Sequence, residues 1–187
     1  MCDILVSTDD PEIDAVARAA GALVPWLRPP ERATDTSIAV DAALHALNWY
    51  EAAHGTLDGL LMLQPTTPFT RKNTIRHGIS SFASHNCRSV LGVSPAASHP
   101  MWCFRKDVTY LSPFLVEHRL QMRSQDLPAT YVVNGCFFLS APAVIRTCYA
   151  LYENQALLLV IDSPKETRDI DTQWDWQIAQ WALSQEY

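Results

Sequence analysis

Residues 59–69 read Gly-Leu-Leu-Met-Leu-Gln-Pro-Thr-Thr-Pro-Phe, an apolar run that stops abruptly at polar and proline residues. The four apolar residues after Gly59 are too few for a buried helix, and they favour a short strand covered on both faces, as in a parallel sheet. In open α/β sheets, ligands bind beyond the carboxyl ends of the strands. We therefore expect Gln64 and the threonines that follow it to face a binding crevice.

The composition indicates one globular domain, spanning residues 1–187, that does not bind nucleic acid. Of the 187 residues 48% are hydrophobic, which allows a sizeable core. The net charge is -6 and no run of Lys or Arg exceeds two residues, so no nucleic-acid footprint is expected. Charged residues are only 18% and there are six Trp, which favours an additional buried surface such as an oligomer interface.

Cysteine usage and hydropathy predict the compartment. The five cysteines include no Cys-x-x-Cys pair and are typical of reduced thiols in the cytoplasm. No apolar run approaches the ~18 residues of a membrane span, and no basic-then-apolar leader precedes the first expected strand. The sequence therefore predicts a cytoplasmic protein without a membrane partner.

Strands and helices alternate along most of the chain. Strands are expected near residues 3–8, 22–27, 60–63, 89–94, 131–139 and 157–161. Helices are expected between them, with Asp10 and Thr70 as caps, and a Trp-rich helix closes the chain. This order predicts an α/β fold in which a mostly parallel, doubly wound sheet lies between two layers of helices. The strand at 60–63 is expected at its centre.

The alternation breaks between Pro95 and Thr130. Aromatic and basic residues occur there without clear periodicity. Exposed aromatic residues often mark an interface between subunits. We expect residues 96–130 to leave the sheet and to contact another subunit.

Asp169 and Asp171 are the first candidate site residues. Because they are two apart, both carboxylates point the same way if the segment is extended. Two such carboxylates suit Mg²⁺, which takes one or two protein oxygens and completes its shell with water and substrate phosphate. Alternatively, Asp171 caps the final helix and Asp175 favours its N-terminus. The spacing alone leaves both interpretations open.

Other polar residues follow expected strands or interrupt them. Ser7 and Gln64 either meet a ligand or belong to turns, and Arg28 either meets a phosphate or is solvated. Asn134 and Gly135 sit inside an apolar strand, where a turn competes with a bulge that brings the backbone close to a ligand. No two glycines lie within three residues of each other, so a phosphate-cradling loop is missing.

Six segments occur in a fixed order along nearly the whole chain. They are Val-Ser-Thr-Asp at 6–9, Arg-Pro-Pro-Glu-Arg-Ala-Thr-Asp at 28–35, Leu-Gln-Pro-Thr-Thr-Pro at 63–68, Ser-Gln-Asp-Leu-Pro at 124–128, Tyr-x-x-Asn-Gly at 131–135 and Asp-Ile-Asp-Thr at 169–172. Together they resemble the CMP-sialic acid synthetases, or acylneuraminate cytidylyltransferases, including relatives that use legionaminic or pseudaminic acid. The resemblance implies a Rossmann-like nucleotidyltransferase fold with a dimerisation extension at residues 96–130. It also implies a homodimer that transfers CMP from CTP to a nine-carbon 2-keto sugar acid and releases pyrophosphate.

The resemblance further implies catalytic roles for two residues. Asp169 and Asp171 match the metal-binding aspartates of the family, which are expected to hold Mg²⁺ against the α-phosphate and the attacking anomeric hydroxyl.

The same resemblance implies binding roles for six more residues. Gln64, Asn134 and Gly135 match positions at the sugar. The remaining matches, on the nucleotide side, are Ser7, Arg28 and Asp35.

Two departures from the family pattern bear on activity. The family's Pro-Leu-Arg is Pro68-Phe69-Thr70 here, with Arg71 one place late. The family pattern also begins with a strand and a loop of the type Pro-Ala-Arg-Gly-Gly-Ser-Lys, and this sequence starts after them. We expect an N-terminally shortened protein with at best weak activity on its own. The alternative is a catalytically lapsed paralogue that binds a sugar acid or pairs with a full-length synthetase.

Overall fold

The structure is a computed structural model that describes residues 3–30, 38–85, 89–116 and 120–185. The chain forms two compact units. The first comprises Met1–Met62, Phe82–Val90 and Phe138–Ala156, and the second comprises Leu63–Ser81, Leu91–Phe137 and Leu157–Tyr187. No helix in the described part of the chain is long and apolar enough to cross a membrane.

Among the described residues, the main sheet has four strands in the order β1-β5-β2-β6. Their bounds are Leu60–Met62 for β1, Ser89–Pro95 for β2, Tyr131–Ser140 for β5 and Leu157–Val160 for β6. The predicted strands at 60–63, 89–94, 131–139 and 157–161 are therefore confirmed, and the mixed sheet with its helices confirms the α/β class.

The central, parallel position predicted for β1 is wrong. β1 is an edge strand in this order and pairs antiparallel with β5, with Leu60 opposite Ser140. Its residues are only partly buried. Leu60 and Met62 pack against the core formed by α2 and α4. The apolar run thus reflects packing on these helices, and a run this short does not distinguish an edge strand from a central one.

In the first unit, α1 spans Pro11–Ala19. The helix starts as predicted, because the Asp10 carboxylate accepts hydrogen bonds from the amides of Glu12 and Ile13 at 2.7 and 3.3 Å. The segments on either side form only isolated parallel bridges, and so the full strands predicted at 3–8 and 22–27 are absent from the described structure.

The core of the first unit lies between α2, Ala39–His54, and α4, Pro142–Cys148. Val40 and Ala43 of α2 pack against Ile145 of α4. An ion pair of 2.6 Å between Arg146 and Glu51 joins the two helices at the surface.

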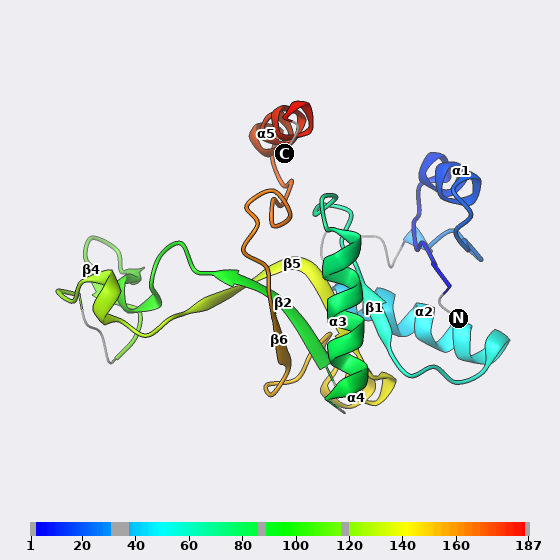
Figure 1. Ribbon diagram of the computed structural model, residues 1–187, viewed down its shortest axis with the longest axis horizontal. Helices are drawn as coiled ribbons and strands as arrows, with labels where there is room; N and C mark the ends of the chain where they lie inside the picture. The colour runs from blue at the N-terminus through cyan, green and yellow to red at the C-terminus, as the bar shows by residue number, and fades with distance from the viewer. Residues whose placement is uncertain (1–2, 31–37, 86–88, 117–119, 186–187) are drawn as a thin grey trace. The chain divides into compact units, whose positions relative to one another are not determined.

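The second unit holds the start of α3, Lys72–Ser84, and the C-terminal helix α5, Gln173–Ser184. It also holds the predicted excursion, which we call the arm, residues 96–130. The arm contains a two-stranded antiparallel sheet of β3, Phe104–Lys106, and β4, Leu111–Pro113. Short 3-10 helices, Pro100–Trp102 and Ser124–Asp126, flank it. Figure 1 shows the chain leaving the main sheet along β2 and returning along β5.

Candidate functional site

Gln64 lies in a tight turn two residues beyond the end of β1. The amide and the hydroxyl of Thr67 both donate to the carbonyl oxygen of Gln64, at 3.2 and 3.1 Å. The Thr67 side chain is buried, which fixes the turn from beneath. The polar residues therefore follow the strand as the sequence predicted.

Gly135 brings the backbone of β5 directly against this turn. Its φ is +75°, a conformation that favours glycine. A Cβ at this position would lie 2.6 Å from Oε1 of Gln64 and 3.5 Å from Cγ2 of Thr67. Gly135 lies inside β5, so the turn interpretation is wrong, and the close approach of backbone to a neighbouring polar side chain is what the structure contains.

The Asn134 side chain is engaged within the sheet. Its Nδ2 donates to Oγ of Ser94 at 3.0 Å, and its Oδ1 accepts from the amide of Cys136 at 3.1 Å. Ser94 in turn donates to the carbonyl oxygen of Ile161 at 3.2 Å. These bonds bracket Gly135 and hold its backbone in place.

Asp169 and Asp171 lie in the loop between β6 and α5. The amide of Ile170, between them, donates to the carbonyl oxygen of Thr66 at 2.9 Å. This single bond sets the aspartate pair beside the turn that carries Gln64. We call residues 64–67, Gly135 and residues 166–171 together the polar junction.

The predicted capping alternative for Asp171 is wrong. Thr172 caps α5, because its hydroxyl accepts from the amide of Asp175 at 3.2 Å while the Asp175 carboxylate accepts from the amide of Thr172 at 3.0 Å. A further hydrogen bond from the Thr172 hydroxyl lowers the pKa of Asp175. Asp171 is exposed and is not needed for the cap.

The two aspartates fit a divalent cation. Oδ1 of Asp169 is buried and has no hydrogen-bond partner among the described residues. A buried carboxylate oxygen without a partner is costly unless a ligand or cation satisfies it. No group of three or more His, Cys, Asp or Glu side chains suited to a metal occurs in the described residues. A carboxylate pair alone matches Mg²⁺, which leaves its other positions to water and substrate.

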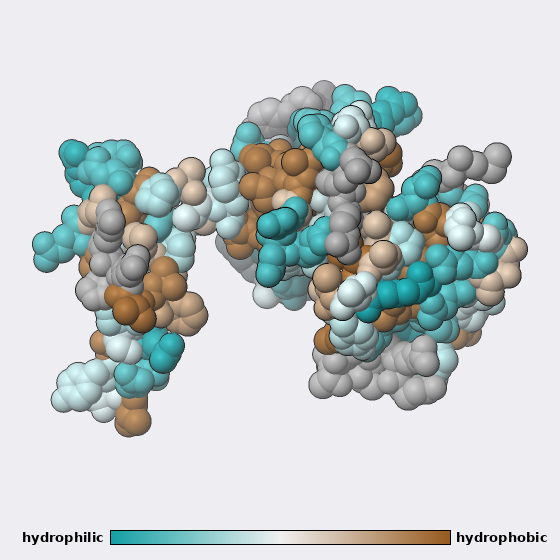
Figure 2. Space-filling model, turned by 90° about the horizontal axis from the view of Figure 1, so that it is seen from below, coloured by the Kyte–Doolittle hydropathy of each residue, from teal (hydrophilic) through white to brown (hydrophobic). Residues whose placement is uncertain are grey.

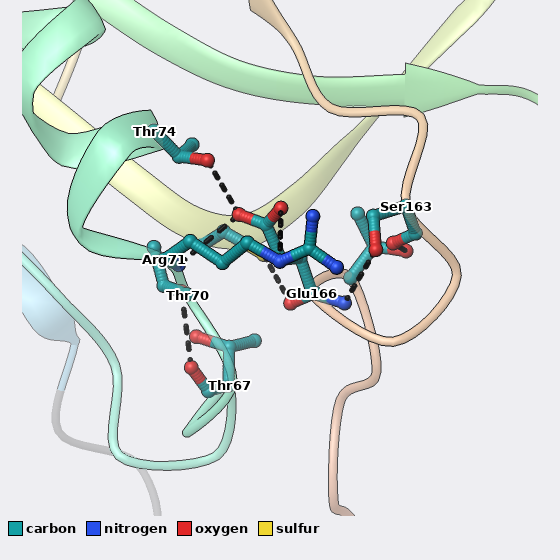
Figure 3. Close-up of polar contacts among 8 residues, drawn as sticks. Thr67, Thr70, Arg71, Thr74, Ser163 and Glu166 are labelled. Atoms are coloured by element: carbon teal, nitrogen blue, oxygen red, sulfur yellow. Dashed lines mark hydrogen bonds and ion pairs between the residues drawn. The ribbon is translucent and has the colours of Figure 1, made fainter. Parts of the chain in front are cut away.

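Glu166 is the residue that the sequence reasoning missed. It is only 4% exposed, and its carboxylate accepts from the Thr74 hydroxyl at 2.5 Å and the Arg71 amide at 3.1 Å (Figure 3). Nε of Arg71 lies 3.4 Å from the other carboxylate oxygen. Glu166 thus occupies the N-terminus of α3, where Thr70 was expected as the cap; the Thr70 hydroxyl donates instead to the carbonyl of Thr67.

Cys136 completes the buried side of the polar junction. Its thiol lies 3.2 Å from the carbonyl oxygen of Glu166, toward which it donates. Burial raises the pKa of the Cys136 thiol, so the group stays neutral at ordinary pH and acts as a weak donor. It links the middle of β5 to the loop that carries the aspartates.

Ser7 and Arg28 lie together in the first unit. Nη2 of Arg28 donates to the carbonyl oxygen of Ser7 at 2.9 Å, and the Arg28 amide donates to that of Thr8 at 2.7 Å. Oγ of Ser7 and Nε of Arg28 are buried, without partners in the described part of the chain. Asp35, the third residue predicted on the nucleotide side, falls outside the described residues.

Comparison with known proteins places the chain in a family. No family model matches it. It is 33% identical over 180 residues to CMP-N,N'-diacetyllegionaminic acid synthase of Legionella pneumophila, an alignment covering 95% of this chain and 76% of that protein. The chain belongs to the acylneuraminate cytidylyltransferase family. Within the family it is also 22% identical over 178 residues to pseudaminic acid cytidylyltransferase of Campylobacter jejuni, covering 95% of this chain and 76% of that protein. An N-acylneuraminate cytidylyltransferase of Streptococcus agalactiae matches at 28% identity over 74% of this chain and 32% of its own length.

Solved structures place this family member in the Rossmann-like nucleotidyltransferase fold. CMP:2-keto-3-deoxy-manno-octonic acid synthetase complexed with CTP superposes with a TM-score of 0.69 at 12% identity, covering 100% of this chain and 83% of that one. The 4-diphosphocytidyl-2C-methyl-D-erythritol synthase of Anaerococcus prevotii gives a TM-score of 0.60 at 12% identity, with coverage of 98% and 82%. These likenesses confirm the predicted fold class, and the family confirms the resemblance read from the six segments.

Proposed function

We propose that this chain transfers CMP from CTP to a sialic-type sugar acid. The observation that carries the proposal is the 2.9 Å bond from the Ile170 amide to the Thr66 carbonyl, which joins the aspartate pair to the Gln64 turn. A metal-binding pair beside a polar sugar-binding turn is what cytidylyl transfer to a hydroxylated acid requires. Membership of the acylneuraminate cytidylyltransferase family supports the same conclusion.

In this proposal Asp169 and Asp171 hold Mg²⁺. A bound Mg²⁺ would supply positive charge to offset the negative charge that develops at the α-phosphate. The partnerless oxygen of Asp169 would supply one ligand, and exposed Asp171 would supply the second. The hydrogen bond from Ile170 to Thr66 holds the backbone between the two aspartates beside the Gln64 turn.

Gln64 and Gly135 form the sugar side. A glutamine amide both donates and accepts, which suits hydroxyl groups of a sugar. The absence of a side chain at Gly135 leaves room for the Gln64 amide beside β5. Asn134 keeps this backbone in place and contributes to sugar binding. Ser7, Arg28 and Asp35 are proposed to bind the nucleotide.

The reaction is a displacement at phosphorus. The anomeric hydroxyl oxygen of the sugar acid forms a bond to the α-phosphorus of CTP. The bond from that phosphorus to the oxygen bridging to the β-phosphate breaks, and this oxygen leaves as part of pyrophosphate. The hydroxyl proton passes to solvent. Such transfers depend on positioning and charge neutralisation more than on covalent participation by the protein.

A pyrophosphate-release assay over a panel of sialic-type acids tests the proposal. With CTP and Mg²⁺ we expect release for at least one acid. Asp169→Asn should reduce the rate roughly 100-fold or more, because a bound metal contributes several kcal/mol of charge stabilisation. Asp162→Asn, an exposed aspartate in the same loop, is the control and should leave the rate unchanged. Equal rates for both variants would contradict the metal assignment.

The arm is proposed to form a homodimer interface. Several of its large apolar side chains are exposed, and Figure 2 shows hydrophobic surface on this part of the chain. Val108 is 99% and Tyr110 79% exposed. A second copy of this chain would cover such a surface, because contiguous exposed apolar patches usually mark an interface.

A further inference from the structure

Glu166 carries its negative charge where burial is expensive. The residue is almost fully buried, and its carboxylate is satisfied by groups 92 and 95 residues away in the sequence, on Thr74 and Arg71. Helix N-termini favour negative charge, so the start of α3 stabilises the carboxylate. A buried charge held in this way fixes two distant segments against each other. The contacts therefore tie the loop after β6 to the start of α3.

Glu166, which makes these contacts, lies three residues before Asp169. Further hydrogen bonds hold the loop that contains both residues. The Ser163 carbonyl accepts from both the amide and the hydroxyl of Thr167, each at 3.1 Å. The Ser163 hydroxyl accepts from the amide of Glu166 at 3.4 Å (Figure 3). On the far side of Asp169, Ile170 is bonded to Thr66. Asp169 is thus bracketed by two anchors.

Arg71 is oriented by the same carboxylate. Its side chain is 60% exposed while Nε lies 3.4 Å from Glu166. A guanidinium presents five donors in a rigid fork, so an ion pair made through Nε leaves donors of the terminal nitrogens for other acceptors. The pair holds a positive charge at the edge of the polar junction.

We propose that Glu166 is a positioning residue that fixes both Asp169 and the Arg71 guanidinium for binding of the metal–nucleotide complex. The inference rests on the proposed function. Glu166 touches no reacting atom; it acts through the loop and through Arg71. Residues that orient metal ligands in this way commonly change metal affinity about 10–100-fold when replaced.

Three variants of the full chain separate positioning from general stability. Glu166→Gln keeps the shape but removes the charge, and its amide nitrogen would face Nε of Arg71, a donor facing a donor. Thr74→Val removes one hydrogen bond to the carboxylate and keeps the charge. Glu166→Asp keeps the charge on a shorter side chain and tests rescue.

Binding of Mn²⁺ with CTP, followed by electron paramagnetic resonance without sugar acid, is the first readout. We expect Glu166→Gln to weaken Mn²⁺ binding at least about tenfold, Thr74→Val by less than about threefold, and Glu166→Asp to fall between them. If the parent chain binds Mn²⁺ with CTP and Glu166→Gln binds equally well, the positioning role is overturned and the proposed function stands.

Amide hydrogen exchange of the ligand-free protein is the second readout. We expect exchange of residues 167–171 to accelerate at least about tenfold in Glu166→Gln, because local opening then breaks weaker, uncharged hydrogen bonds, while β5 is unchanged. If the parent fails to bind Mn²⁺ with CTP, the proposed function is overturned. The hydrogen-exchange measurement then still tests whether Glu166 positions the loop. Unchanged exchange at residues 167–171 would overturn it.

Discussion

The arm and the polar junction belong to the same unit and are built in opposite ways. The polar junction is formed by residues far apart in sequence whose polar groups satisfy one another, as in the bonds from Arg71 and Thr74 to Glu166. In the arm, several side-chain bonds are local, such as that from Ser112 to Asp107, and large apolar side chains remain exposed. The contacts of the polar junction thus come from distant parts of one chain, whereas the exposed side chains of the arm agree with the dimer interface proposed for it.

The largest effect is expected from placing negative charge on exposed apolar residues of the arm. We expect the double substitution Val108→Asp and Tyr110→Asp to raise the dimer dissociation constant roughly 30-fold or more, since interface anchors often contribute ≥2 kcal/mol. Both side chains are exposed in the single chain, so folding should be unaffected. Sedimentation equilibrium measures the change.

The control for the arm is Val16→Asp on α1, which is also exposed, at 70%. It should leave the dissociation constant unchanged. A parent chain that stays monomeric at high concentration, or equal dimerisation of all three proteins, would remove the arm's proposed role.

Within the polar junction, Gly135→Ala tests the close approach of the β5 backbone to the Gln64 turn. The substitution adds a Cβ in a left-handed conformation and also places it 2.6 Å from Oε1 of Gln64. We expect a loss of about 2–3 kcal/mol in unfolding free energy from urea denaturation, against about 1–2 kcal/mol for the strain alone. Gly21→Ala separates the two causes, because Gly21 has a φ of +86° and nothing within 4 Å of an added Cβ. Equal losses of unfolding free energy at both sites would show that the contact with Gln64 does not affect stability.

The smallest effect is expected at the start of α5, which follows residues 166–171 of the polar junction. The hydrogen bond from Thr172 lowers the pKa of Asp175 in the folded state, so this contribution to stability is present above the unfolded value near 3.8 and is lost as pH falls through the folded value. We expect Asp175→Asn to have a lower thermal midpoint than the parent near neutral pH. The gap should close as the pH falls below 3.8. A difference in thermal midpoint that stays constant as the pH falls would exclude the Thr172–Asp175 cap as its cause.

Local chemistry made much of the fold predictable. Asp10 and Pro11 mark the start of α1, and the Asp169-Ile170-Asp171 spacing identified the segment beside the Gln64 turn. The α5 cap was also readable: Thr172 with Asp175 three residues later is the spacing of a capping box, and it outweighs a lone Asp171.

Long-range pairing was not predictable. Glu166 sits in a Ser-Pro-Lys-Glu-Thr loop that reads as solvated, and nothing local links it to Arg71, 95 residues away. The edge position of β1 was not predictable for the same reason, because the neighbours of a strand are set by tertiary pairing. Val16 on α1 follows the apolar periodicity of a buried stripe, yet it is 70% exposed. Periodicity gives a helix its apolar face but does not identify what covers that face.

Calorimetric titration of the chain with CTP, in the presence and absence of Mg²⁺, tests the central claim most directly. The polar junction, with its partnerless Asp169 oxygen, predicts saturable CTP binding that requires Mg²⁺. No detectable binding, or binding equally strong without Mg²⁺, would contradict the assignment of Asp169 and Asp171 as the metal site of a cytidylyltransferase.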